Sequence, residues 1–213
     1  MKQKEASQLA KQPTVELVLS VKKEFEENER YSNEDKIQKI ITEKVFDKER
    51  YETYLMTVIL INELYSTNIY RTDIIANHIF KNRDEIYFLI KNGDSKAVER
   101  IAKGHGVGVK TEENKKELNF YSFASKYCNY FNSEEFPIYD SYIDNMLWIY
   151  KNNDSFHIFK REDMKNYESF RSIVREFRIY YNLQKFSLRD IDKFLWLYGK
   201  TIYSSKYNGR ENK

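Results

Sequence analysis

The sequence is poor in cysteine, glycine and proline, and each shortage excludes a class of protein. Cys128 is the single cysteine among 213 residues, so the chain forms no internal disulfide and no zinc finger built on cysteine pairs. Six glycines and two prolines are too few for the closely spaced turns of a β-sandwich or a propeller. The same low counts exclude collagen-like and linker-rich chains.

Long hydrophobic runs are also missing. The longest run, residues 58–61, is far short of the roughly 18 apolar residues that indicate a membrane span. The first five residues lack the apolar core of a secretory signal. We therefore expect a cytoplasmic protein without a membrane partner.

Net charge does not identify a partner. The 36 Lys and Arg residues against 33 Asp and Glu residues give a net charge of +3. Nucleic-acid-binding proteins often carry a basic face whose charge is offset elsewhere, so the distribution matters more than the sum. Hydrophobic residues make up 41% of the chain, which is enough for a core, and the length predicts one large domain or two lobes folded together.

Apolar residues recur at helical spacing along most of the chain. The pattern predicts helices over residues 15–25, 32–45, 51–65, 72–80, 83–90, 95–102, 122–131, 141–150, 167–181 and 187–197. Ser32 to Asp35 resembles a capping box that begins the second of these helices, and Ser187 to Asp190 precedes the last. No stretch sustains period-two alternation, so we expect an almost entirely α-helical protein.

Three of the six glycines fall within residues 104–108, in a loop that runs from Lys103 to Lys116. Glycine lets backbone amides approach a phosphate, and lysines attract it electrostatically. The candidate nucleic-acid-binding residues here are Lys103, Gly104, His105, Gly106, Gly108, Lys110, Lys115 and Lys116. The alternative is a solvated loop, since Glu112, Glu113 and Glu117 dilute the positive charge.

A helix, a proline-containing loop and a second helix follow between Ser122 and Ile143. Pro137 disfavours the α conformation in Phe136 and so breaks the helical pattern. Asp140 stands where the second helix begins, and its carboxylate can accept amide hydrogens there. The helix dipole favours the charged form at this position. The segment therefore predicts a rigid, ionised carboxylate.

This segment resembles the core of the helix-hairpin-helix DNA glycosylase superfamily, whose members remove damaged or mispaired bases from DNA. Asp140, behind Pro137, matches the position of the family's catalytic aspartate. The adenine-excising branch has Ser at the first helical position and the motif Pro-Ile-x-Asp eighteen residues on, a spacing that Ser122 and Asp140 reproduce. The wider chain is similar to bacterial oxoguanine-glycosylase-like proteins over residues 60–67, 122–140 and 190–199.

The resemblance implies a single all-α, two-lobed domain that binds double-stranded DNA between its lobes, and we expect a monomer. We expect residues 70–150 to form the hairpin lobe, residues 15–69 and 151–213 to form the packing lobe, and residues 1–14 to be loose. Asp140 would stabilise the oxocarbenium character that develops at the sugar and orient a water. Two features depart from the family pattern. The positions of its glycine hairpin, residues 117–121, contain no glycine, and Ser122 stands where lyase-competent branches have a lysine.

Several further side chains are candidates for the chemistry or for base stacking. Lys126, one helical turn after Ser122, is a candidate nucleophile that would form an imine with the sugar; the alternative is an exposed helical lysine. Asp140 and Ser122 have alternatives too, as an ordinary N-cap and an ordinary helix residue. The candidate stacking residues are Tyr121, Tyr139 and Tyr142, with Tyr127, Tyr130 and Phe131, all of which are alternatively core aromatics.

Two other functions stay open. One is a non-catalytic DNA- or RNA-binding module in which Asp140 only caps a helix, and the other is a helical protein–protein scaffold. The sequence does not identify a protein partner. His105 has no His or Cys neighbour at ligand spacing, and His78 and His157 are far away in the sequence, so we expect no metal and no cofactor.

Overall fold

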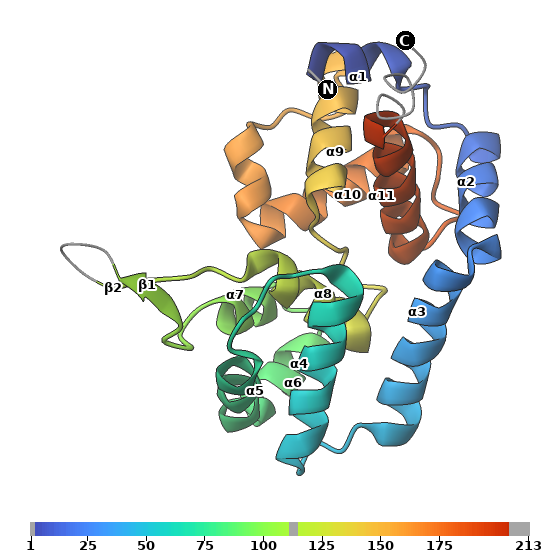
Figure 1. The fold of residues 1–213 in the computed structure, drawn as a ribbon. Helices are drawn as coiled ribbons and strands as arrows, with labels where there is room; N and C mark the ends of the chain where they lie inside the picture. Colours follow the sequence, from blue (N-terminus) through green and yellow to red (C-terminus); the bar gives the residue numbers. More distant parts are fainter. Residues whose placement is uncertain (1–2, 111–114, 205–213) are drawn as a thin grey trace, which may run out of the picture. The chain divides into compact units, whose positions relative to one another are not determined.

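The structure is a computed structural model that describes residues 3–110 and 115–204 (Figure 1). Within these ranges the regular structure is helical, apart from one two-stranded antiparallel hairpin. The prediction of an all-α protein is therefore confirmed. No helix in the described ranges is long and apolar enough to cross a membrane.

The chain divides into two compact units. The terminal unit comprises residues 1–32 and 139–213, and the central unit comprises residues 33–138. We expected the division near residues 70 and 150, whereas it falls at 32/33 and 138/139. The second of these points directly follows Pro137, in the stretch without regular structure between two helices.

The helices of the terminal unit come from both ends of the chain. They are α1 (Gln3–Leu9), α2 (Val15–Glu27), α9 (Ser141–Asp154), the 3₁₀ helix η2 (Arg161–Lys165), α10 (Tyr167–Tyr180) and α11 (Leu188–Ser204). Helix α11 packs against both α2 and α9. Phe25 of α2 and Trp196 of α11 bring their rings together, with centroids 6.3 Å apart, so helices from the two ends of the chain share one core.

Residues 3–9, which we expected to be loose, form helix α1 instead. Ala6 is fully buried, and α1 contacts α9. The chain after α1 is held as well, because the Tyr150 hydroxyl donates to the Lys11 carbonyl at 3.0 Å. The apolar contact is made by one small residue, which is why hydrophobic periodicity does not reveal this helix.

Helix α3 (Glu29–Ile40) crosses the boundary between the units and continues as one π-helical turn, η1 (Ile41–Val45). The predicted helix start at Ser32 is wrong, because Ser32 already lies inside α3. The Asn28 side chain instead accepts the amide hydrogen of Arg30 at 3.1 Å. The Ser32 hydroxyl donates to the Glu29 carbonyl, a bond within the helix.

The central unit holds the remaining elements. They are α4 (Tyr51–Tyr65), α5 (Thr72–Lys81), α6 (Arg83–Lys91), α7 (Lys96–Ala102), β1 (Gly108–Lys110), β2 (Lys115–Glu117) and α8 (Tyr121–Phe131). Helix α4 packs on α5 and α8, and α7 packs on α8. Val58, Ile79 and Tyr127 are among the buried residues of this core.

The hairpin β1–β2 was not predicted. Gly108 pairs with Glu117, and Lys110 pairs with Lys115. A Cβ atom at Gly108 would stand 2.4 Å from the Lys116 carbonyl oxygen, so only glycine permits this close approach. The hairpin projects away from the helices of its unit in Figure 1.

Candidate functional site

Asp140 caps helix α9 of the terminal unit, as the sequence predicts. Its Oδ1 accepts the Tyr142 amide hydrogen at 2.9 Å, and its backbone is extended, with φ −143° and ψ 156°. The Asp140 carbonyl accepts from the Asp144 amide at 2.9 Å and begins the helical bonding. The half-buried carboxylate is therefore fixed in direction at the positive end of the helix.

The chain before the unit boundary is equally fixed. The fully buried side chain of Asn129 donates from Nδ2 to the Phe136 carbonyl at 2.7 Å. Phe136 itself is fully buried. The end of the central unit is thus held in place up to Phe136, within the break that follows α8.

Lys126 is buried in the central unit, with 3% of the residue exposed. Its Nζ donates to the Ser122 Oγ at 2.6 Å and lies 5.7 Å from the centroid of the Tyr65 ring. The alternative of an exposed helical lysine is therefore wrong. Lysine is rarely buried to this degree in proteins, so the position is distinctive.

A polar network that sequence reasoning missed lies beside Asp140 in the terminal unit. Asp144 is only 4% exposed, and it accepts from the Tyr139 hydroxyl at 2.8 Å. The guanidinium of Arg161 donates to Asp144 from Nε at 3.0 Å and from Nη2 at 2.6 Å. The ammonium of Lys165 contacts the Tyr139 hydroxyl. Burial, and then the bond to Asp144, raise the pKa of Tyr139.

The structure places the candidate stacking tyrosines differently from one another. Tyr139 is 8% exposed, with the Lys165 ammonium 4.6 Å from its ring centroid and Phe170 at its edge, so its ring faces are not open to a base. Tyr142 is half-buried against Tyr203, with ring centroids 6.1 Å apart. Tyr121 is half-buried at the start of α8.

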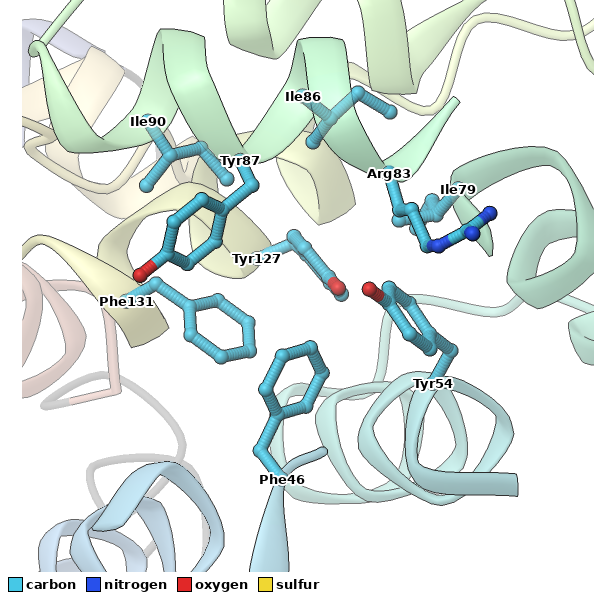
Figure 2. Close-up of a pocket in the computed structure, with 9 residues that line it drawn as sticks. All are labelled: Phe46, Tyr54, Ile79, Arg83, Ile86, Tyr87, Ile90, Tyr127 and Phe131. Atoms are coloured by element: carbon cyan, nitrogen blue, oxygen red, sulfur yellow. The ribbon is translucent and has the colours of Figure 1, made fainter. Parts of the chain in front are cut away.

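Tyr127 and Phe131 belong to an aromatic core in the central unit. Figure 2 shows them on one side of a small pocket, with Phe46 and Tyr54 facing them and α6 above. The ring centroids of Phe46 and Phe131 are 4.7 Å apart. Tyr130 is also buried. Cys128 is buried, and burial raises its pKa, which fits an inert packing residue.

The glycine loop binds an anion that belongs to the protein itself. The Glu117 carboxylate accepts the amide hydrogen of Gly106 at 2.7 Å and that of Gly104 at 3.2 Å. Both glycines have positive φ, which turns their amides toward one point. The Gly106 amide, together with that of Gly104, lowers the pKa of Glu117. Sequence reasoning left two interpretations of this loop, a phosphate-binding site and a solvated loop, and did not foresee Glu117 as the bound anion.

His105 lies beneath this loop with its side chain buried. Its Nδ1 accepts the Val107 amide hydrogen at 3.1 Å, so the proton is on Nε2, which donates to the Ala102 carbonyl at 3.1 Å. Burial lowers the pKa of the imidazole. A neutral, enclosed ring holds the loop in shape, and both of its nitrogens are already engaged in hydrogen bonds within the protein, so His105 does not match the predicted phosphate ligand.

The lysines of the loop differ in their surroundings. Lys103 is exposed and lies 3.4 Å from Glu99, and Lys116 is exposed. The side chains of Lys110 and Lys115 lie outside what the structure describes. Across residues 3–110 and 115–204, no three His, Cys, Asp or Glu side chains gather as they would around a metal ion.

Comparison with known proteins identifies a family. A protein-family model described as "HI_0787_N: N-terminal domain" matches residues 15–135, which is more than half of the chain. A Haemophilus influenzae protein named "Uncharacterized protein" is 37% identical over 157 residues, which are 74% of this chain and 71% of that protein. No solved structure matches. The extent of both matches shows that this chain belongs to the HI_0787_N family.

Proposed function

We propose that the protein binds double-stranded DNA and hydrolyses the N-glycosidic bond of a damaged or mispaired base, with Asp140 as the catalytic carboxylate. The observation that carries this proposal is the fixed carboxylate itself. Asp140 is held at the start of α9 by the Tyr142 amide, three residues after Pro137. This is the position of the catalytic aspartate in the DNA glycosylases that the segment resembles.

The chemistry requires little more than a positioned negative charge. The bond between C1′ and the base breaks, the base leaves with the electron pair and takes a proton, and C1′ gains oxocarbenium character. The Asp140 carboxylate stabilises this positive charge and orients a water, which adds to C1′ and gives up a proton. The products are a free base and an abasic sugar.

The order of elements along the chain supports the same proposal. Helices α1 and α2 pack with α9 and α11 in the terminal unit, and the central unit is inserted between them in the sequence. The resemblance implies this return of the N-terminal helices to the C-terminal ones.

Lys126 supports a covalent variant of the reaction. Its amine would attack C1′ and, after the base has left and the sugar ring has opened, would be joined to the sugar as an imine. Desolvation of an amine is one route to such a nucleophile, and the burial of Lys126 is consistent with it.

Release of a base from DNA tests the proposal. Purified protein is incubated with duplexes that each contain one lesion or mispair, and the free base is measured under single-turnover conditions. Asp140→Asn keeps an N-cap but removes the charge, so folding is preserved. We expect base release to fall by about 10²-fold or more.

Asp94→Asn is the matched control. The Asp94 carboxylate accepts the Lys96 amide hydrogen at 2.9 Å, which is the same local arrangement on an exposed turn. Its substitution should leave base release unchanged. If the unsubstituted protein binds DNA in a salt-dependent manner but releases no base, a non-catalytic binding module replaces the enzyme. Absence of DNA binding at low salt would instead favour the protein–protein scaffold.

A further inference from the structure

The network around Asp144 carries more positive charge than its buried carboxylate needs. Asp144 contributes one negative charge, and its neighbours Arg161 and Lys165 contribute two positive charges. Arg161 already satisfies one carboxylate oxygen through two donors, at 3.0 and 2.6 Å. The Lys165 ammonium is 3.8 Å from the other oxygen, so it adds charge without a close ion pair.

Both cations keep donors available at the surface. The Arg161 side chain is 37% exposed and the Lys165 side chain is 64% exposed. Arg161 donates from Nε and Nη2, and among the described residues the structure records no acceptor for its Nη1. The Lys165 ammonium has three hydrogens and contacts one hydroxyl, that of Tyr139.

The surrounding side chains extend the positive surface. The Trp148 ring lies 5.9 Å from the Arg161 guanidinium carbon and 4.7 Å from the Lys151 ammonium, measured to the ring centroid. Three nearby acidic residues weaken it, namely Asp140 at the start of α9 and Glu162 and Asp163 of η2. Asp163 is engaged by the Lys160 amide at 2.7 Å, and Glu162 is exposed. Cations interleaved with aromatic rings are typical of nucleic-acid-binding surfaces.

We propose that Arg161 and Lys165 form a phosphate-binding subsite on the terminal unit, and that it takes a backbone phosphate of DNA. The subsite rests on the proposed function for the identity of its ligand. A guanidinium and an ammonium side by side suit a phosphate diester, since both donate charge-assisted hydrogen bonds to its oxygens. Tyr139 links this pair to Asp140, because it contacts Lys165 and is the residue before Asp140 in the chain. A phosphate held here would anchor the strand beside the carboxylate.

A substitution at Lys165 can test DNA binding without a large change in the stability of the fold. Its ammonium is largely exposed, so its ion pair adds little to stability. Arg161 differs, because its loss would leave Asp144 buried with its charge uncompensated. Lys165→Gln is therefore the informative substitution. Lys185→Gln is its control, since Lys185 is an exposed lysine of the same unit and the structure records no ion pair between it and any described residue.

The experiment measures the affinity of the full chain for a short fluorescent duplex at several salt concentrations. We expect Lys165→Gln to weaken binding about 3- to 10-fold at low salt and to reduce the slope of log K against log salt by about one. Lys185→Gln should change neither quantity, and the melting temperatures of both variants should match that of the unsubstituted protein.

Each outcome bears on the proposal. Equal slopes for the two variants, or no DNA binding by the unsubstituted protein, would overturn the subsite. Base release is measured on the same samples, so that a failure of the subsite can be distinguished from a failure of the proposed glycosylase activity. A reduced slope without base release from any lesion retains the subsite and removes the enzyme. Base release with an unchanged slope retains the enzyme and removes the subsite.

Discussion

The Glu117 carboxylate accepts the amide hydrogen of Gly106 at 2.7 Å, and this bond gives the glycine loop its anion. Two positive-φ glycines turn amides toward one point, which is the arrangement that would suit a phosphate. The carboxylate arrives from strand β2, eleven residues further along the chain. The loop is therefore an anion site whose occupant is internal.

The loss of stability in Glu117→Gln should itself depend on pH, because Gln cannot titrate and Glu117 can. Because the pKa of Glu117 is lowered in the folded protein, its contribution is complete above the ordinary value of 4.5 and is lost as the pH falls through the folded value. At pH 7 we expect a loss of about 1 kcal/mol, limited by solvent screening of a side chain that is 37% exposed. Urea unfolding at pH 7 and below pH 4 measures it. A difference that stays constant over this range contradicts the account.

Lys126 should form a covalent adduct with abasic DNA. The buried amine condenses with the sugar aldehyde to an imine and water, and borohydride reduces the imine to a stable amine. We expect the adduct in the unsubstituted protein and its loss in Lys126→Gln, measured by denaturing gel electrophoresis. Lys185→Gln, which removes an exposed lysine outside the proposed binding surfaces, should retain it. Absence of an adduct in the unsubstituted protein would exclude Lys126 as a nucleophile.

Tyr127 should be replaceable by Phe but not by Ala. Its ring is 2% exposed in the aromatic core of the central unit, and among the described residues the structure records no hydrogen bond for its hydroxyl (Figure 2). Removal of that hydroxyl should change the free energy of unfolding by less than about 0.5 kcal/mol. Loss of the ring in Tyr127→Ala should cost about 3–5 kcal/mol. Equal losses for both substitutions would show that the hydroxyl is needed.

Ser187→Ala should destabilise the start of α11. The Ser187 hydroxyl accepts the Asp190 amide hydrogen at 3.1 Å, and the Asp190 carboxylate accepts the Ser187 amide hydrogen at 3.1 Å. Loss of this reciprocal cap should cost about 1 kcal/mol in thermal or urea unfolding. Ser172→Ala, at an exposed position within α10, should stay within about 0.5 kcal/mol. A similar loss in both variants would mean that the cap adds nothing specific.

Local signals predicted most of the helices. Helix α4 begins and ends at the predicted residues 51 and 65, because its apolar pattern is continuous between polar flanks. The caps at Asp140 and Ser187 were also predicted, since a cap involves residues two or three apart. The prediction of a cap at Ser32 rested on the same kind of local evidence and was wrong. Asn28 offers a competing cap four residues earlier, and local sequence does not rank the two.

Contacts between residues that lie far apart along the chain were not predicted from the sequence. Arg161 reaches Asp144 across 17 residues, and hydrophobic spacing says nothing about which charged side chains will meet. The sequence did not show whether the Lys126 side chain is exposed or buried, because burial depends on how the helices pack around α8. Glu117 reaches the glycine loop from the hairpin β1–β2. Strands this short show no alternation of apolar and polar residues, so the sequence pattern did not reveal the hairpin.

The sequence by itself determined the helical class, most helix limits and the carboxylate cap of α9, because each depends on groups within a few residues of one another. The tertiary structure alone decided that Lys126 is buried, that Glu117 fills the glycine loop and that Arg161 and Lys165 meet at Asp144. Those outcomes depend on which surfaces pack together and exclude water, and packing is a property of the whole fold.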